Sequence, residues 1–149
     1  MASTISGTTF QVTVKEEHIV KDVRTLNETL YKVSDVTNFD RRIVTCPNTT
    51  SIDLININGV NPGAGTFPSS SIKYARITNL DDAYSLIVTL SGSSDEYWSQ
   101  EVLPTSSFMW TSANITGSEF SGPLSSTLEV VSVYASGSSI DVEYVFVNA

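Results

Sequence analysis

The sequence predicts an all-β fold, a single β-sandwich of about eight or nine strands with jelly-roll or Greek-key connections. Short apolar runs recur along the chain at intervals of roughly 10–15 residues and alternate with polar positions, as half-buried strands do. Turn-forming Asp, Ser, Gly and Pro separate these runs. The polar remainder is dominated by Ser, Thr and Asn, which favour strands and turns over helices.

A chain of 149 residues is most simply a single domain, here residues 1–149. A domain of this length buries roughly two-thirds of the surface that its unfolded chain exposes. Neither half of the chain has enough apolar strands to bury a good core alone. We expect residues 1–8, which are polar and precede the first apolar run, to form an extended N-terminal arm.

The first predicted strand covers residues 9–14, where Phe10, Val12 and Val14 alternate with polar side chains. We expect residues 18–20 to continue this strand beyond a bend at Glu16 and Glu17.

Residues 23–36 fit either a helix or a strand. Thr25 and Glu28 are spaced as in a helix capping box, and helix-like spacing also relates Val23, Leu26, Leu30 and Val33. Residues 29–33, however, have the composition of a strand. A strand is favoured because all the surrounding segments are β and a lone short helix would need its own packing partner.

Two short strands follow, at residues 41–46 and 51–57, joined by a turn at Pro47. Residues 58–71 form the longest predicted loop. Pro and Gly are so frequent at its centre that we expect no regular element there, only a crossover between the two halves of the fold.

The second half of the chain alternates more cleanly and carries the remaining predicted strands. These are Ile72–Leu80, Ser85–Leu90, Tyr97–Leu103, Leu128–Tyr134 and Ile140–Val147, and Phe108–Trp110 is a further apolar run. In the last strand, an apolar stripe that ends at Phe146 is opposed by Asp141 and Glu143. Residues 117–126 are predicted to be a loop.

Charge and hydropathy argue against two classes of binding partner for this chain, namely nucleic acid and the membrane. A net charge of −8 with only eight basic residues disfavours nucleic acid, since phosphate contacts need clustered Lys and Arg. No apolar run approaches the roughly 20 residues of a membrane span, so no membrane partner is expected. The N-terminus has neither the basic start nor the apolar core of a secretion signal, which predicts a protein made in a cytoplasm and kept soluble.

Nucleophilic and metal chemistry have few candidate residues, because the chain holds one Cys and one His. His18 is the only imidazole and the chain has no Gly-x-Ser-x-Gly nucleophile elbow, so His18 is expected to be a solvated or structural residue. Cys46 is expected to be a small buried hydrophobic residue at the end of its strand. The sequence therefore predicts no catalytic residue, no metal ligand and no cofactor.

Paired carboxylates leave two other chemistries open. Acid pairs at residues 16–17, 81–82 and 95–96 could in principle cleave a glycoside, which needs only two suitably spaced carboxyls. A calcium site from Asp81, Asp82 and Asp95 is also conceivable, although the usual calcium-loop motif is absent. Each pair lies at a strand end or turn, where acidic residues commonly serve solubility and turn geometry.

Four aromatic residues are the candidate contact residues: Tyr97, Trp98, Phe108 and Trp110. Tyr and Trp at a loop edge can stack on sugar rings or anchor a protein interface. Because neighbouring residues of a strand point to opposite faces, at least one of Tyr97 and Trp98 is expected in the core. Core packing is favoured over an interface, and an interface over glycan contact.

An ordered set of segments in the second half carries a family resemblance. Residues 74–80 (YARITNL) lead into 86–90 (LIVTL), then a Gly/Ser turn, Leu103-Pro104, residues 107–110 (SFMW) and finally 142–147 (VEYVFV). This order resembles small all-β structural proteins of tailed-bacteriophage virions, over residues 71–149.

The resemblance implies a non-enzymatic virion protein of the capsid decoration, or cement, type. Such proteins sit over capsomer junctions as jelly-roll oligomers, often trimers. The implied partners are the major capsid protein or other virion proteins and further copies of the chain, with a trimer favoured and the virion as its location. The alternative is a receptor- or carbohydrate-binding β-sandwich module of a phage tail or fibre, which would expose Trp98 or Trp110.

Overall fold

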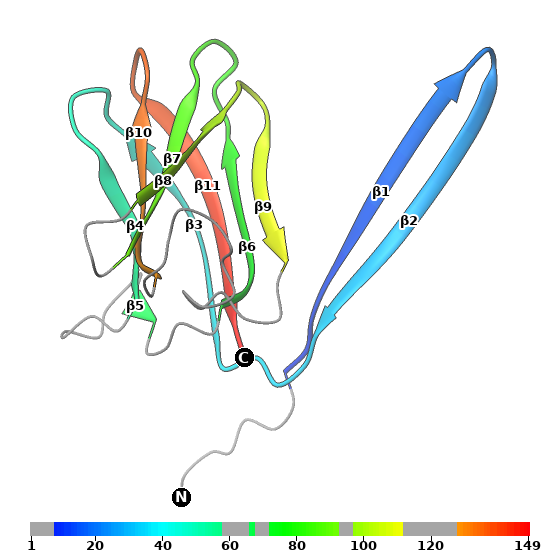
Figure 1. Cartoon of the computed structure of the whole chain (residues 1–149), viewed down its shortest axis with the longest axis horizontal. Coiled ribbons are helices and arrows are strands. Elements are labelled where there is room, and N and C mark those ends of the chain that lie inside the picture. Colours follow the sequence, from blue (N-terminus) through cyan, green and yellow to red (C-terminus); the bar gives the residue numbers. More distant parts are fainter. Residues whose placement is uncertain (1–7, 58–65, 68–71, 93–96, 112–127) are drawn as a thin grey trace, which may run out of the picture.

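The computed structural model describes residues 8–57, 66–67, 72–92, 97–111 and 128–149. They form eleven strands: β1 (Phe10–Val20), β2 (Val23–Val33), β3 (Asn38–Cys46), β4 (Ile52–Ile57), β5 (Thr66–Phe67), β6 (Ile72–Asn79), β7 (Leu86–Gly92), β8 (Tyr97–Val102), β9 (Ser107–Thr111), β10 (Leu128–Ala135) and β11 (Ile140–Asn148). Nine of them build a sandwich of a five-stranded sheet, β5-β4-β10-β7-β8, and a four-stranded sheet, β3-β11-β6-β9 (Figure 1). The predicted all-β sandwich is confirmed.

The core lies between the two sheets and is filled by the inward-facing side chains of both sheets, which alternate with outward-facing ones along each strand. Its largest fully buried side chain is Phe146, on β11 at the centre of the four-stranded sheet. The two halves of the chain interlock here, because β3 of the first half pairs with β11 of the second and β4 pairs with β10. The strands of the first half therefore complete both sheets of the second.

Strands β1 and β2 stand outside the sandwich as a two-stranded hairpin, which Figure 1 shows projecting to one side. We call residues 10–33 the hairpin, and residues 15–30 its apex. All eleven residues of β1 pair with β2 in one unbroken register, from Phe10 opposite Val33 to Val20 opposite Val23. The expected bend at Glu16 and Glu17 is therefore wrong, because cross-strand pairing continues straight through both positions.

The strand favoured for residues 23–36 is confirmed over residues 23–33, and the helix alternative is not what forms. The apolar residues that matched a helical spacing are divided between the two faces of the hairpin. Val23 and Val33 share a face with their partners on β1, whereas Leu26 lies opposite Glu17 and Leu30 opposite Thr13 on the other face. The alternating faces of a strand therefore explain the positions of these apolar residues without a helix.

The hairpin turn is made by Lys21 and Asp22, with φ of 48° and 64°. Two central residues with positive φ are the signature of a type I′ turn, whose twist matches that of the flanking strands. Such turns favour Asn-Gly, so Lys-Asp is an unusual occupant that accepts left-handed backbone at both positions.

Two further boundaries differ from the sequence-based expectation. The loop expected at 58–71 contains the short strand β5, which pairs in parallel with β4 at Asn56 and Ile57. Strand β3 begins three residues before Arg41, because β11 is long enough to pair with it as far as Asn38. The loop predicted at 117–126 and residues 1–7 of the predicted N-terminal arm lie outside the described residues; Thr8 is hydrogen-bonded to the backbone of Val36.

Candidate functional site

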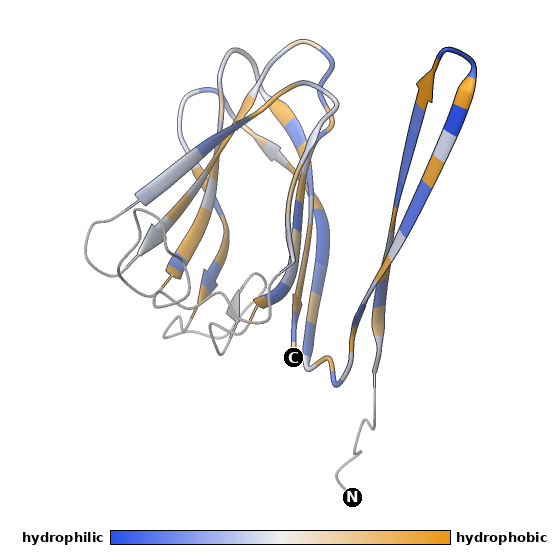
Figure 2. Cartoon of the chain, turned by 45° about the vertical axis from the view of Figure 1, so that its right-hand side comes forward, coloured by the Kyte–Doolittle hydropathy of each residue, from blue (hydrophilic) through white to orange (hydrophobic). Residues whose placement is uncertain are grey.

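The hairpin apex is the most exposed apolar structure in the described part of the chain. Every residue from 15 to 30 is exposed. Five large apolar side chains there are between 48 % and 66 % exposed: Ile19, Val20, Val23, Leu26 and Leu30. Figure 2 shows apolar bands along the hairpin as far as its tip. An isolated two-stranded hairpin is only marginally stable in water, so this apex is a surface that suits a further partner.

The base of the hairpin is fixed to the sandwich by a second apolar cluster. Val33 is buried there with Tyr74, Val145 and Val147, which lie on the outer face of the four-stranded sheet. The rings of Phe10 and Tyr74 are 5.0 Å apart between centroids. Burial raises the pKa of Tyr74, and the nearby charge of Arg76 opposes that shift. The hairpin thus leaves the sandwich from a packed base.

Polar contacts tie the two strands of the apex together. Arg24 Nε lies 2.7 Å from Glu17 Oε1, and Asn27 Nδ2 donates to Glu16 Oε2 at 3.1 Å. Exposed ion pairs of this kind contribute about 0–1 kcal/mol, so they set the register of the apex more than its stability.

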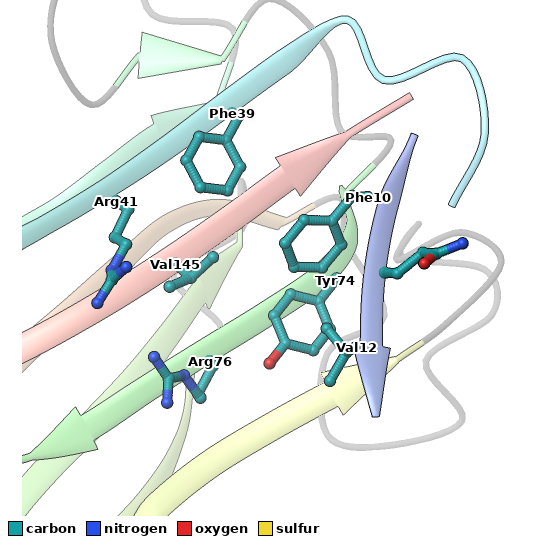
Figure 3. A pocket seen from close by; sticks show the side chains of 8 residues that line it. Phe10, Val12, Phe39, Arg41, Tyr74, Arg76 and Val145 are labelled. Carbon is teal, nitrogen blue, oxygen red and sulfur yellow. The ribbon is translucent and has the colours of Figure 1, made fainter. Parts of the chain in front are cut away.

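A pocket of about 300 Å³ opens where the hairpin meets the four-stranded sheet. Figure 3 shows its lining, with β1 on one side and the outer face of β3, β11 and β6 on the other. Its lining residues are Phe10, Gln11, Val12, Phe39, Arg41, Tyr74, Arg76 and Val145. The walls are mainly aromatic and aliphatic, so the pocket suits an apolar side chain.

Two arginines at this pocket share one carboxylate. Arg41 Nε and Arg76 Nη2 both donate to Oε1 of Glu143, at 2.8 Å and 2.9 Å. The three side chains come from β3, β6 and β11, which the sheet register places side by side. The group carries one net positive charge, and the side chain of Arg41 is 63 % exposed. Arg41 can therefore donate a hydrogen bond to a further carboxylate or carbonyl oxygen.

Strand β3 borders this site as an edge strand of the four-stranded sheet. On its outer face Phe39 is 55 % and Ile43 64 % exposed. On its inner face Asp40 accepts hydrogen bonds from Arg42 at 2.9 Å and from the Tyr144 hydroxyl at 3.2 Å. The Asp40 contact raises the pKa of Arg42, and burial together with the charge of Asp40 raises the pKa of Tyr144 to about 12.

The four predicted contact residues do not form one surface. Trp98, Phe108 and Trp110 pack partly buried against the core in a continuous aromatic row. Ring centroids are 5.6 Å apart between Trp98 and Phe108 and 5.2 Å apart between Phe108 and Trp110. Tyr97 points the other way and is 69 % exposed. The indole Nε1 of Trp110 is buried and has no hydrogen-bond partner within the part of the chain described.

The remaining candidates have structural surroundings. His18 is an exposed residue of the apex. Cys46 is fully buried, as expected; its Sγ lies 3.5 Å from the Val133 carbonyl oxygen, and burial raises its pKa. Asp81 Oδ1 accepts hydrogen bonds from the backbone N–H groups of Ala83 and Tyr84, which explains one acid of its pair by turn geometry.

Residues 95 and 96 of the third acid pair, and with them part of the conceivable calcium site, lie outside the described residues. Within the described ranges, no group of three or more His, Cys, Asp or Glu side chains gathers that could hold a metal ion. No helix long and apolar enough to cross a membrane occurs in that same part of the chain.

Comparison of the chain with protein-family models, curated proteins and solved structures finds no match. The site is therefore defined by its geometry alone. Sequence reasoning missed the hairpin as a unit. The signal was present, because two segments of alternating residues flank Lys21 and Asp22, but a type I′ turn without Asn or Gly is hard to recognise.

Proposed function

We propose that this protein is a non-enzymatic assembly protein whose hairpin binds a neighbouring protein subunit. The observation that carries the proposal is the exposed apolar apex of the hairpin, fixed at its base to a sandwich. The setting we propose is the one that the resemblance implies, decoration of a phage shell by a homo-oligomer, with a trimer favoured. Major capsid protein or another virion protein would then be the second partner.

The energetics of the apex suit association. Taking its five large apolar side chains from their present exposure into an interface would contribute about 1 kcal/mol each, before the costs of association. The hairpin is already fixed by its packed base, which lowers the ordering cost that a flexible segment would meet on binding.

The distribution of charge also singles out the hairpin. Residues 10–33 contain four basic and four acidic side chains and are electrically neutral. The rest of the chain contains four basic and twelve acidic side chains and so carries the whole net charge of −8. Two sandwiches therefore repel each other, whereas the hairpin of one copy can approach the sandwich of another without this penalty.

The test is the mass of the purified full chain by light scattering after size exclusion. We expect an oligomer that dissociates when Leu26 and Leu30 are both changed to Thr, which keeps the strand propensity and removes apolar surface. Leu103→Thr, at an exposed leucine outside the hairpin, is the matched control and should leave the mass unchanged. A wild-type monomer at high concentration contradicts self-association.

The phage setting has a separate test. Particles purified on a density gradient from lysates of cells that encode the chain should contain it in stoichiometric amounts. Its absence from such particles contradicts decoration and leaves the assembly role of the hairpin to the light-scattering result.

No observation favours the carbohydrate-binding alternative. That alternative requires an exposed tryptophan, and both Trp98 and Trp110 pack partly buried against the core. Tyr97 is the exposed member of the predicted set, and a single tyrosine is a weak stacking platform for a sugar.

A further inference from the structure

Among the described strands of the sandwich, β3 has the longest unpaired edge. Within the described residues β3 pairs with β11 on one side and with no strand on the other. Its nine residues compare with six in β8, five in β9 and two in β5, the other strands at sheet edges. A long edge of unpaired backbone N–H and C=O groups is a template for strand addition.

Few of the usual devices protect this edge. Strand β3 contains no Pro and no Lys, and its register with β11 is unbroken by a bulge. Its two inward charges, on Asp40 and Arg42, are already paired with each other. Its outer face presents Phe39 and Ile43 with Arg41 between them, a row of apolar, basic and apolar side chains.

The hairpin presents the complementary row on β2. Leu26, Glu28 and Leu30 alternate along one face, and all three are exposed. The edge of β2 away from β1 is unpaired within the described part of the chain. This row is apolar, acidic and apolar, with the same two-residue spacing as the row on β3.

We propose that β2 of one copy adds in antiparallel register to the free edge of β3 in a second copy, so that the hairpin extends the sheet β3-β11-β6-β9. The register places Leu30 opposite Phe39, Glu28 opposite Arg41 and Leu26 opposite Ile43, all on the outer face. Each cross-strand pair is either apolar with apolar or acidic with basic, the pairs that stabilise neighbouring strands. This inference rests on the proposed function and names the surface that the hairpin binds.

The charges at the receiving edge support this occupant. Arg41 and Arg76 share one oxygen of Glu143, which leaves positive charge beside the incoming Glu28. The pocket of about 300 Å³ lies next to Phe39 and Arg41 and offers space for an apolar side chain of the added strand (Figure 3).

The contact joins two different surfaces of the chain. Such a head-to-tail contact is not self-complementary and closes into a ring when the rotation per subunit allows it. A trimer formed in this way agrees with the oligomer that the resemblance implies.

The test is disulfide trapping between two separately purified full-length variants. Leu26→Cys and Ile43→Cys are both at exposed positions, and the native Cys46 is fully buried. Directly opposite residues of antiparallel strands have Cα atoms about 4.5–5.5 Å apart, which is within the range that a disulfide spans. When the two variants are mixed and oxidised, we expect a mixed disulfide between them. Each variant oxidised alone, and Leu26→Cys mixed with Leu103→Cys, should give none.

Other outcomes overturn the inference in distinguishable ways. Trapping of Leu26→Cys by Phe39→Cys, in place of Ile43→Cys, would show a parallel register. Disulfides of Leu26→Cys with itself would show that hairpins pair with each other, which overturns the inference and leaves the proposed function standing. If light scattering finds an oligomer but no disulfide is trapped, the inference is likewise overturned and the proposed function stands. If light scattering finds a monomer, both the inference and the proposed self-association are contradicted.

Hydrogen exchange gives a second readout that needs no cysteine. Raising the concentration of the wild-type chain should slow amide exchange in residues 23–33 and 38–46 together and leave residues 97–102 of β8 unchanged. Glu28→Gln should weaken self-association by about threefold, because it removes the charge that faces Arg41 and places no second cation beside Lys15, the partner of Glu28 in its own hairpin. Glu101→Gln, at an exposed position on β8, is its control. Slowing confined to the hairpin contradicts the assignment of β3.

Discussion

Tyr31 on β2 donates its hydroxyl hydrogen to the backbone carbonyl oxygen of Lys73 on β6, across 2.9 Å. This polar contact joins the hairpin to the sandwich beside the apolar cluster at the hairpin base. Figure 1 shows the hairpin projecting away from the sandwich beyond this base, so the orientation of the hairpin depends on the base.

Changing Tyr31 to Phe should therefore loosen the hairpin without unfolding the sandwich. The loss of one hydrogen bond is expected to cost about 1 kcal/mol at the hairpin base. Amide exchange should become faster in β1 and β2 and stay unchanged in β11. Tyr97→Phe, which removes an exposed hydroxyl, is the control; equal effects of the two variants would show that the Lys73 contact does not hold the hairpin.

The turn at Lys21 and Asp22 can be improved by substitution. Asn at position 21 and Gly at position 22 accept positive φ at lower cost than Lys and Asp, so this double change should stabilise the hairpin by about 1 kcal/mol. Slower amide exchange in the apex is the measurement. Lys21→Pro should act in the opposite sense, because proline fixes φ near −65°. Failure of the two changes to act oppositely would contradict the assigned turn.

Asn79 is a buried amide that joins three parts of the sandwich. Its Nδ2 donates to the carbonyl oxygens of Tyr84 and Val102, at 2.8 Å and 3.2 Å, and its Oδ1 accepts from the N–H of Asp81. Asn79→Ala leaves these buried groups without a partner and should lower the free energy of unfolding by about 2–3 kcal/mol. Urea denaturation measures this loss.

The neighbouring Thr78 provides the control for Asn79. Its hydroxyl shares a hydrogen bond of 2.8 Å with Ser107 on the outer face, where water can replace the lost partner. Thr78→Ala should therefore cost less than about 1 kcal/mol. A cost at Thr78 as large as that at Asn79 would mean that burial is not the source of the effect.

The raised pKa of Tyr144 predicts a loss of stability in alkali. In the folded chain burial and Asp40 raise this pKa to about 12, whereas an unfolded tyrosine titrates near about 10. The folded state therefore holds the proton more tightly, so the stabilisation is complete below about pH 10 and is lost as the pH rises toward 12. Urea denaturation at several pH values in this interval should show a falling free energy of unfolding.

Tyr144→Phe should reduce the slope of that fall, because the titrating hydroxyl is gone. Part of the slope should remain, since burial also raises the pKa of Tyr74 and Cys46. An unchanged slope in Tyr144→Phe would contradict the assignment of the effect to this hydroxyl.

The candidate site was only partly predictable from sequence. Alternation of apolar and polar residues identified nearly every strand, including β11 with its stripe ending at Phe146. The alternation does not indicate, however, whether another part of the chain covers the outer face of a strand. Val145 and Val147 point away from the sandwich core and are nevertheless buried, because the base of the hairpin packs over them.

The all-β class, the positions of most strands and the burial of Cys46 could be predicted from the sequence, because they follow from local periodicity and side-chain polarity. The pairing of β3 with β11 and the position of β1 and β2 outside the sandwich could not. The same holds for the contact among Arg41, Arg76 and Glu143, which come from three strands. Such contacts join residues far apart in the chain, and their choice depends on the packing of whole sheets, which no local pattern records.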